Sequence, residues 1–277
     1  MGKFKIALIQ LDTTEDKETN RLDVTRRVSE AAEKGAKLVV LPEHSDAIGK
    51  HERRFSEPVP GEMSRFYSDL AKRNNIYLHC GSMTEENSGN SPYNTSLVFD
   101  PNGDQIALYR KLHMFDVAIA GGPNIMESRG VSKGDRISIV KTALCSMGLS
   151  ICYDIRFGEI YRIMAENGAQ LLVVSANFTE NTGRLHWETL VRARAIENGC
   201  YVAAVDQCGE KYNFKSWGHT MLVDPFGKII SELHQEPGTI IADIDTSLVE
   251  KAQSQIPVLK NTRDDIYTLS SEYIHMY

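Results

Sequence analysis

The chain alternates short apolar segments with amphipathic ones, and it repeats this order in two halves. Each half predicts a strand, a helix, a strand, a helix, a strand and then a hairpin. The two hairpins share an Asp-Pro-x-Gly turn, at residues 100–103 and again at residues 224–227. Two such halves can pack sheet against sheet, with their helices on the outside. Because no linker or low-complexity run divides them, we expect one α/β domain over residues 1–277 with internal pseudo-symmetry.

Hydrophobic periodicity sets the boundaries of the predicted elements. We expect strands at residues 4–11, 37–41, 76–83, 96–99, 105–109, 137–140, 147–152, 170–174, 201–205 and 239–244. We expect helices at residues 18–34, 63–73, 158–167, 186–197 and 246–255. In the first helix, the predicted apolar side carries Leu22, Val28 and Ala32. Residues 112–135 are predicted to be a long Gly-rich loop, which favours a functional role, and residues 256–277 an irregular tail.

The composition excludes several classes of protein. A net charge of −6 without a basic run argues against nucleic-acid binding. No apolar stretch approaches the ~18 residues that a membrane span needs, and the N-terminus enters a strand without a signal-peptide pattern. The five cysteines are odd in number and widely spaced, which favours reduced thiols in the cytoplasm over disulfides. Since zinc-ligand spacing is also missing, we expect no metal and no cofactor.

The segment from Ser146 to Phe157 predicts an apolar strand that ends abruptly at Cys152. A polar turn and a helix follow, so the thiol lies at the carboxyl end of a strand, where ligands collect in open α/β sheets. A helix N-terminus lowers the pKa of a nearby thiol. We therefore predict that Cys152 is a nucleophile. The alternative is a small buried apolar residue, which free cysteine often is.

Two other predicted strands also end in reactive side chains, one at Glu43 and one at Lys111. If the three strand ends lie together, a carboxylate can take the proton of the thiol as a general base. Lysine, together with a backbone N–H such as that of Tyr153, can stabilise the oxyanion that forms on an amide carbonyl. The alternatives are an ordinary turn carboxylate at Glu43 and a solvated charge at Lys111.

Three motifs resemble the nitrilase, or carbon–nitrogen hydrolase, superfamily. They are Leu41-Pro42-Glu43, Tyr109-Arg110-Lys111-Leu112-His113 and the run from Ile151 to Glu159. The resemblance implies a four-layer αββα sandwich of two packed mixed sheets with outer helices. It implies a Glu-Lys-Cys triad in which Glu43 is the general base, Lys111 the oxyanion stabiliser and Cys152 the nucleophile. It also implies that a second glutamate, Glu127, holds Lys111 and the substrate.

Further segments are similar to the branch of ω-amidases and deaminated glutathione amidases, among them Ser216-Trp217-Gly218-His219. This branch implies substrate contacts at Arg156, Phe178 and Thr182, with Tyr153 beside the nucleophile. It implies hydrolysis of a carboxamide to an acid and ammonia through a thioester, with deaminated glutathione as the first candidate substrate and α-ketoglutaramate as the second. It also implies a homodimer or larger homo-oligomer, formed through helices beside the active site and the tail at 256–277.

Some alternatives stay open at this point. They are an N-carbamoyl amino-acid amidohydrolase, a nitrile hydrolase and a binding protein without turnover on the same fold. A Cys–His hydrolase is less favoured, because no papain-like or caspase-like signature surrounds Cys152. The chain departs from the family pattern at Gly158, at Ser175 and Asn177, and at Arg184-Leu185. We expect these departures at the wall of the pocket, where they affect the substrate rather than the chemistry.

Overall fold

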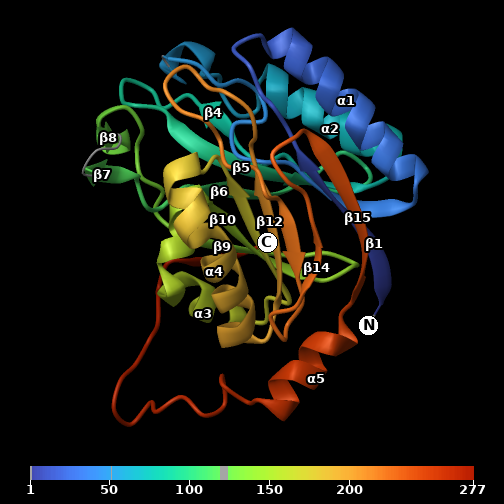
Figure 1. The fold of residues 1–277 in the computed structure, drawn as a ribbon, viewed down its shortest axis with the longest axis vertical. Coiled ribbons are helices and arrows are strands. Elements are labelled where there is room, and N and C mark those ends of the chain that lie inside the picture. The colour runs from blue at the N-terminus through green and yellow to red at the C-terminus, as the bar shows by residue number, and fades with distance from the viewer. Residues whose placement is uncertain (1, 51, 119–123) are drawn as a thin grey trace.

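The structure is a computed structural model that describes residues 2–50, 52–118 and 124–277 (Figure 1). Within these residues the strands form two seven-stranded mixed sheets and one two-stranded ribbon. The first sheet has the order β15-β1-β2-β3-β5-β4, with β6 also paired to β5. The second sheet has the order β14-β13-β12-β11-β10-β9-β16. Each sheet combines parallel pairs, such as β1 with β2 and β10 with β11, with antiparallel ones.

The first sheet contains strands from both ends of the chain. They are β1 (Lys3–Gln10), β2 (Ala36–Val40), β3 (Tyr77–His79), β4 (Met83–Glu85), β5 (Tyr93–Phe99), β6 (Gln105–Arg110) and β15 (Gly238–Asp245). The second sheet contains β9 (Ile137–Lys141), β10 (Ser146–Ile151), β11 (Leu171–Ala176), β12 (Tyr201–Asp206), β13 (Met221–Val223), β14 (Ile229–Glu232) and β16 (Ile274–Met276).

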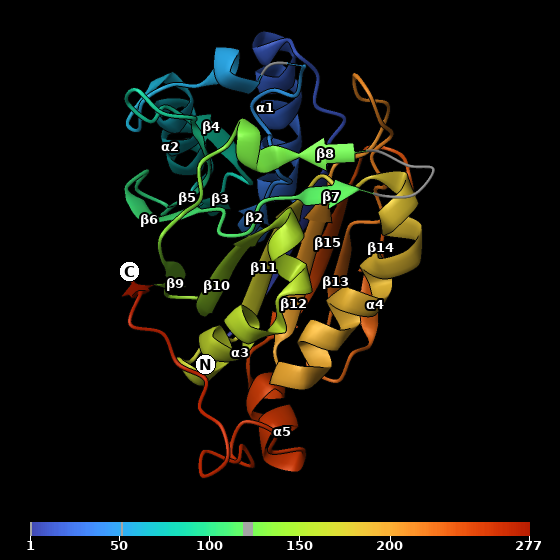
Figure 2. The same cartoon turned by 90° about the vertical axis from the view of Figure 1, so that its left-hand side faces the viewer.

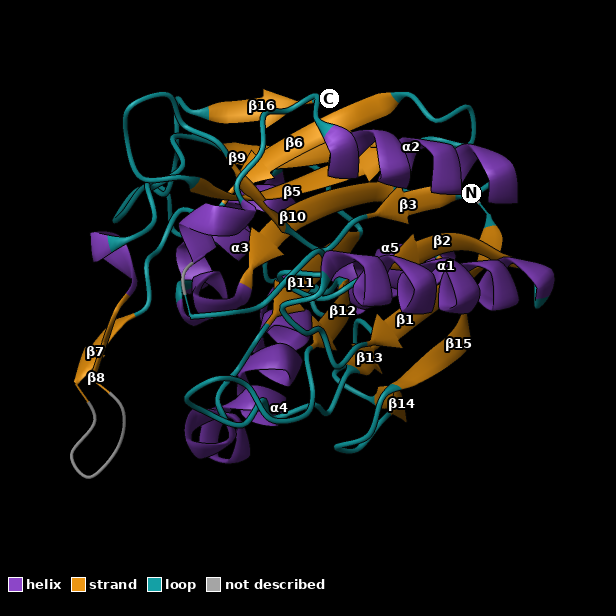
Figure 3. Ribbon diagram, turned by 90° about the horizontal axis from the view of Figure 1, so that it is seen from above, coloured by secondary structure: helices purple, strands orange, loops and turns teal. Residues whose placement is uncertain are grey.

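The helices lie on the outer faces of the two sheets. Helices α1 (Lys17–Glu33) and α2 (Glu62–Asn74) cover the first sheet, and α3 (Gly158–Glu166) and α4 (Glu180–Asn198) cover the second (Figures 2 and 3). Helix α5 (Ser247–Gln255) lies at one end of the molecule, and short 3-10 turns occur at Glu52–Phe55, Glu127–Arg129 and Cys152–Arg156.

Side-chain alternation along the strands explains the layers. In β1, Ile6 and Leu8 point into the core shared by the two sheets, whereas Ala7 and Ile9 point toward the helices on the other face. The shared core also contains Leu149 and Val173 of the second sheet. All of these side chains are completely buried. The prediction of a four-layer αββα sandwich with mixed sheets is therefore confirmed.

The two halves of the chain are interleaved rather than separate. Strand β15, from the second half, crosses to the first sheet and pairs antiparallel with β1, from Lys3 opposite Asp245 to Gln10 opposite Gly238. The repeated strand-helix order could not reveal this crossing, because the choice of pairing partner is not a local property of the sequence.

Four expectations about local structure were wrong. The predicted strand at 76–83 splits into β3 and β4, because Gly81 adopts a φ of +73° and packs its backbone against the Pro42 carbonyl. In α1 the buried positions are Asn20, Val24, Val28 and Ala31, whereas Leu22 is 65% exposed and Ala32 is half-buried. Helix α4 begins at Glu180, six residues before the predicted start.

The fourth wrong expectation is the loop predicted at 112–135. This segment contains two short strands, β7 (Asp116–Ala118) and β8 (Asn124–Met126), which pair as an antiparallel ribbon. Residues 119–123 of that loop lie outside the described residues.

The C-terminal tail leaves α5, runs outside the body of the molecule and returns to the second sheet (Figure 1). Its last residues form β16, parallel to β9, with the Tyr277 N–H donating to the Ile139 carbonyl at 2.9 Å. The tail is thus ordered at its end rather than irregular throughout. Of the helices in the described ranges, none combines the length and the apolar character needed to cross a membrane.

Candidate active site

Three side chains from different strand ends meet in one cavity. Glu43 follows β2, Lys111 directly follows β6, and Cys152 directly follows β10. The cavity measures about 490 Å³ and is also lined by Glu127 and His44. Glu43, Lys111 and Cys152 are buried, at 3%, 2% and 7% exposure, so their charges interact with little screening by water. Two of these strands belong to the first sheet and one to the second, so the cavity lies where the sheets meet.

Lys111 is the centre of a buried ion cluster. Its Nζ lies 3.0 Å from Glu43 Oε1 and 2.8 Å from Glu127 Oε1. The second oxygen of Glu127 accepts the backbone N–H of Phe115 at 2.6 Å. Two carboxylates and several hydrogen bonds therefore offset the cost of removing the ammonium from water.

Asn94 holds both Glu43 and Lys111 in place. Its Nδ2 donates to Glu43 Oε1 at 2.8 Å, and its backbone carbonyl accepts the Lys111 N–H at 2.9 Å. Oε1 of Glu43 thus accepts from two side chains, Asn94 and Lys111. Glu43 and Cys152 line the same cavity, and the Glu43 carboxylate acts electrostatically on the thiol. Glu43 is therefore the base available to take the proton from sulfur.

The charges in this cluster shift the pKa values of its members. Burial by itself would raise the pKa of Glu43, but the electrostatic effect of the Lys111 ammonium, with a further contribution from His44, outweighs it and lowers the pKa below its usual range. Burial would lower the pKa of Lys111, but Glu127 and Glu43 raise it well above its usual range. Burial raises the pKa of Glu127, and Lys111 offsets only part of that effect. Glu43 is therefore a carboxylate and Lys111 an ammonium at neutral pH.

Cys152 is a neutral thiol at neutral pH, contrary to the expectation of a lowered pKa. Burial and the neighbouring Glu43 carboxylate raise the pKa of Cys152 well above its usual range, although Lys111 and the backbone N–H of Asn177 act in the opposite direction. A 3-10 turn separates the thiol from α3, which begins only at Gly158, so the helix N-terminus does not stabilise a thiolate there. The sulfur therefore needs a base to become a nucleophile.

The backbone at Cys152 and a neighbouring aspartate shape the turn. Cys152 adopts a φ of +50°, a left-handed conformation that a non-glycine residue rarely takes. The fully buried Asp154 accepts the Ile151 N–H at 2.9 Å and the Tyr109 hydroxyl at 2.6 Å. It also accepts the His113 N–H at 3.1 Å and lies 2.7 Å from His113 Nδ1.

Sequence reasoning did not identify Asp154 or Asn94 as part of the site. No spacing rule predicts them, because the bonds from Asn94 to Glu43 and from Asp154 to Tyr109 and His113 join residues 41 to 51 positions apart in the chain.

A small side pocket opens from Cys152 and brings together the predicted substrate-binding residues. Tyr153, Arg156, Phe178 and Thr182 line it with Cys152, Asn177 and other neighbours. The Arg156 guanidinium carbon lies 5.6 Å from the Tyr153 ring centre and 5.3 Å from that of Phe178. Aromatic faces hold a guanidinium group without using its N–H donors. Arg156 Nη1 lies 3.2 Å from His186 Nδ1, and the other N–H groups can still bind a carboxylate.

The departures from the family pattern lie in different places. Asn177 lines both the main cavity and the side pocket, as expected. Ser175 instead is buried and donates to the Leu41 carbonyl at 2.8 Å, which ties β11 to the chain just before Glu43. Arg184 and Leu185 are exposed on α4, and Gly158 faces a separate groove beside α3. The expectation that all of them form the pocket wall was wrong, because side-chain direction on α4 depends on how that helix packs.

The remaining cysteines and histidines have other surroundings. Burial raises the pKa of each of the thiols at positions 80, 145, 200 and 208 to about 12, and none of the four lines the cavity of Cys152. His219 pairs with Glu232 at 2.8 Å, and His113 stacks on Phe157 at 3.6 Å between ring centres. In the part of the chain that the structure describes, no group of three or more His, Cys, Asp or Glu side chains could hold a metal ion.

Comparison with known proteins relates this chain to one family. The sequence model of the carbon–nitrogen hydrolase family matches residues 5–254. Omega-amidase NIT2 of Mus musculus is 40% identical over 275 residues, which cover 98% of this chain and 99% of that protein. Omega-amidase NIT2 of Homo sapiens is 39% identical over 272 residues, which cover 97% and 98%.

Solved structures agree with this relationship. The crystal structure of the C. elegans NitFhit protein superposes with a TM-score of 0.90 at 38% identity and covers 98% of this chain and 69% of that one. That of Saccharomyces cerevisiae Nit3, described as a member of branch 10 of the nitrilase superfamily, gives 0.84 at 31% identity and covers 94% and 97%.

The pKa shifts lead to a prediction about alkylation of Cys152. Because the Glu43 carboxylate raises the pKa of the thiol, Glu43→Gln lowers that pKa. The rate of alkylation by iodoacetamide, followed at Cys152 by peptide mass across pH, should therefore reach its midpoint about one pH unit or more lower than in the wild type. Glu232→Gln, a carboxylate outside the cavity, should leave the midpoint unchanged. An unchanged or higher midpoint in Glu43→Gln would contradict the electrostatic argument.

Proposed function

This chain belongs to the carbon–nitrogen hydrolase family, and we propose that it is a cysteine-dependent amidase that converts the carboxamide of a small carboxylic acid to the acid and ammonia. The observation that carries the proposal is the contact of one buried ammonium, Lys111, with two carboxylates beside a neutral thiol. Acyl transfer from an amide through a thioester needs a base, an oxyanion stabiliser and a thiol, and a carboxylate, an ammonium and a thiol can supply these three roles.

In the first half of the reaction, Glu43 accepts the proton of the Cys152 thiol as the sulfur attacks the amide carbonyl. A carbon–sulfur bond forms, and the carbonyl oxygen gains the negative charge. Lys111 stabilises that charge, together with a backbone N–H such as that of Tyr153. Protonated Glu43 then donates its proton to the nitrogen, the carbon–nitrogen bond breaks, and ammonia leaves a thioester on Cys152.

In the second half, Glu43 accepts a proton from water, and the resulting hydroxide attacks the thioester carbonyl. The groups that stabilised the first oxyanion also stabilise the second one, because the thioester carbonyl oxygen lies where the amide oxygen lay. The carbon–sulfur bond breaks, the sulfur regains a proton from Glu43, and the acid leaves. Glu127 keeps Lys111 pointed at the oxyanion through its 2.8 Å contact.

Arg156 supports a substrate with a second acidic group. The side pocket that it lines measures only about 20 Å³, so the body of such a substrate would lie in the main cavity of about 490 Å³. Among the described residues that line the side pocket, Arg156 is the cation, and the Phe178 and Tyr153 rings flank it. A guanidinium group binds a carboxylate with two hydrogen bonds, while Thr182 offers a hydroxyl. We infer that the substrate is the ω-amide of a small dicarboxylic keto acid. The omega-amidase relatives favour α-ketoglutaramate over deaminated glutathione as the first compound to test.

The proposed reaction predicts loss of turnover without loss of the fold when the sulfur is removed. Cys152→Ala should release no ammonia above background from any amide in a panel of ω-amides and carbamoyl compounds. The wild type should release ammonia from the ω-amides and show an acyl adduct by intact mass. Cys145→Ala, which removes a buried thiol outside the cavity, is the matched control and should retain turnover. Turnover by Cys152→Ala would exclude this cysteine from the reaction.

A second prediction concerns Arg156. Arg156→Gln should raise KM by about tenfold or more for an ω-amide that carries a free carboxylate, because a charged hydrogen-bonded contact is lost. It should leave the kinetics of a neutral amide of the same length unchanged. Equal effects on both amides would show that Arg156 does not bind the carboxylate.

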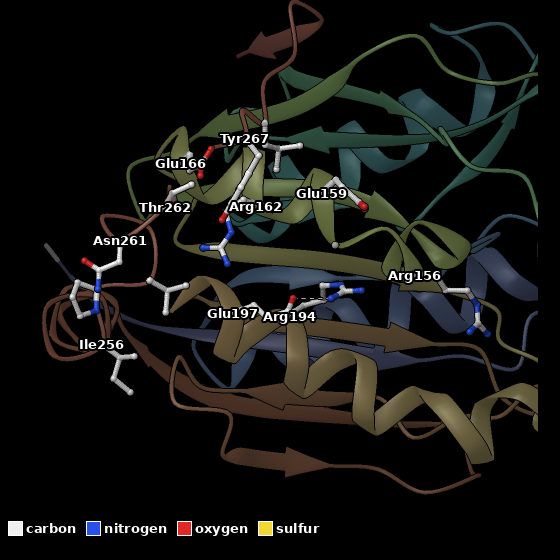
Figure 4. A pocket seen from close by; sticks show the side chains of 14 residues that line it. Arg156, Glu159, Arg162, Glu166, Arg194, Glu197, Ile256, Asn261, Thr262 and Tyr267 are labelled. Carbon is white, nitrogen blue, oxygen red and sulfur yellow. Dashed lines mark hydrogen bonds and ion pairs between the residues drawn. The ribbon is translucent and has the colours of Figure 1, made fainter. Parts of the chain in front are cut away.

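We also propose that the chain forms a homodimer through the face that carries α3, α4 and the tail. A groove of about 710 Å³ lies there, with Glu159 and Arg162 from α3 and Arg194 and Glu197 from α4 along it (Figure 4). Acidic and basic side chains alternate in this groove, which suits contact with a second copy across a two-fold axis. The tail beside it exposes Ile266 and Tyr267, at 71% and 58%.

This face predicts an oligomer in solution. Sedimentation should give a mass of at least twice the 31.0 kDa of the chain. Changing Ile266 and Tyr267 together to Asp should weaken association by about tenfold or more. Leu22→Asp is the matched control, because Leu22 is 65% exposed on α1 at the opposite side of the molecule, and it should not change the mass. A monomeric wild type would refute the proposal.

We propose a reducing compartment such as the cytoplasm. The proposed nucleophile must remain a thiol, and all five cysteines of the chain are free and buried. Free thiols persist where the cell keeps them reduced.

A further inference from the structure

We propose that Asp154 is a positioning residue that fixes the Lys111 ammonium relative to the Cys152 sulfur. Asp154 is fully buried, and its carboxylate accepts hydrogen bonds from two segments that belong to different sheets. One segment, residues 109–113, carries Lys111, and the other, residues 151–157, carries Cys152. Across the described residues, no other side-chain hydrogen bond joins these two segments.

On the lysine side, Asp154 binds the chain both before and after Lys111. The Tyr109 hydroxyl, two residues before it, donates to Oδ2 at 2.6 Å. The His113 N–H, two residues after it, donates to Oδ1 at 3.1 Å, and His113 Nδ1 lies 2.7 Å from the same oxygen. Since the contacts lie symmetrically around Lys111, they fix the direction in which its side chain leaves the backbone.

On the cysteine side, Asp154 stabilises a turn with an unfavourable backbone conformation. The Ile151 N–H donates to Oδ2 at 2.9 Å, and the Asp154 carbonyl accepts the Phe157 N–H at 3.0 Å. The first of these bonds spans Cys152, whose φ of +50° is unfavourable for a residue with a Cβ, and the second closes the rest of the turn. The His113 ring, stacked on Phe157, braces the same turn from the lysine side.

A carboxylate is the group that this position requires. Two backbone N–H groups, the Tyr109 hydroxyl and a ring nitrogen of His113 all face its two oxygens. An ionised carboxylate accepts through both oxygens, whereas the amide of asparagine accepts through one and donates through its nitrogen. Asp154→Asn therefore sets a donor against either the Ile151 N–H or the His113 N–H, whichever way the amide is oriented.

This proposal rests on the proposed function, since Lys111 and Cys152 are taken to act together on one carbonyl. Transition-state contacts depend on their separation, so displacing one against the other reduces the rate of the chemical step more than the binding of substrate. The effect of Asp154 should therefore appear in kcat rather than KM.

The test compares three variants of the full-length chain. Asp154→Asn disturbs the hydrogen bonds to both segments, 109–113 and 151–157. Tyr109→Phe removes one hydrogen bond to the segment that carries Lys111 and keeps the aromatic ring. Ser150→Ala is the control, because buried Ser150 bonds Tyr161 and the Val173 carbonyl, both at 2.7 Å, two residues before Cys152 and within the second sheet. The measurements are kcat and KM for an ω-amide, the melting temperature, and the pH dependence of Cys152 alkylation by iodoacetamide.

We expect kcat to fall about a hundredfold in Asp154→Asn and about tenfold in Tyr109→Phe, with KM unchanged in both. Lys111 lowers the pKa of the Cys152 thiol, so its displacement should also move the alkylation midpoint to higher pH. Ser150→Ala should lower the melting temperature without changing kcat or the alkylation midpoint.

Two results would overturn the proposal. One is a wild-type kcat and alkylation midpoint in Tyr109→Phe and Asp154→Asn. The other is a fall in kcat that is proportional to the fall in melting temperature in all three variants, Ser150→Ala included, without any change in the pH dependence of alkylation. The alkylation readout needs no substrate, so it tests Asp154 even if the wild type hydrolyses none of the amides. A wild type that hydrolyses none of the amides would instead refute the proposed function.

Discussion

The ion cluster of Lys111 with Glu43 and Glu127 is the interaction on which the rest of the site depends. Three charged groups are removed from water here, and their mutual attraction offsets that cost only when the distances are short. Each group comes from a different segment, so the backbone must hold all three firmly. Asn94 holds Glu43 through a bond of 2.8 Å, and the Phe115 N–H holds Glu127 through a bond of 2.6 Å.

The cluster also determines the protonation state in which the site rests. Burial and the negative charge of Glu43 keep Cys152 as a thiol, while the positive charge of Lys111 keeps Glu43 as a carboxylate. A neutral thiol beside an ionised carboxylate is a matched acid and base, so the nucleophile forms when the substrate arrives. This arrangement differs from the thiolate at a helix N-terminus that the strand-turn-helix pattern suggested.

Arg156 connects the site to the outer face of the molecule. Its side chain lines both the side pocket at Cys152 and the groove between α3 and the tail. In Figure 4 it lies at one end of that groove, away from Tyr267. Arg156 thus lies between the residues proposed to bind substrate and the face proposed to bind a second copy of the chain.

The sequence by itself determined most of the strands and helices and the chemical groups at three strand ends, because periodicity and turn residues act over a few neighbours. It did not determine the split of the strand at 76–83, the start of α4, or the short strands β7, β8 and β16. It did not determine that β15 crosses to the first sheet, that Leu22 points to solvent, or that Arg184 lies away from the pocket. Only the tertiary structure decided the raised pKa of Cys152 and the roles of Asn94 and Asp154. Burial and charge at a site come from groups that are distant in the chain, and no local pattern records them.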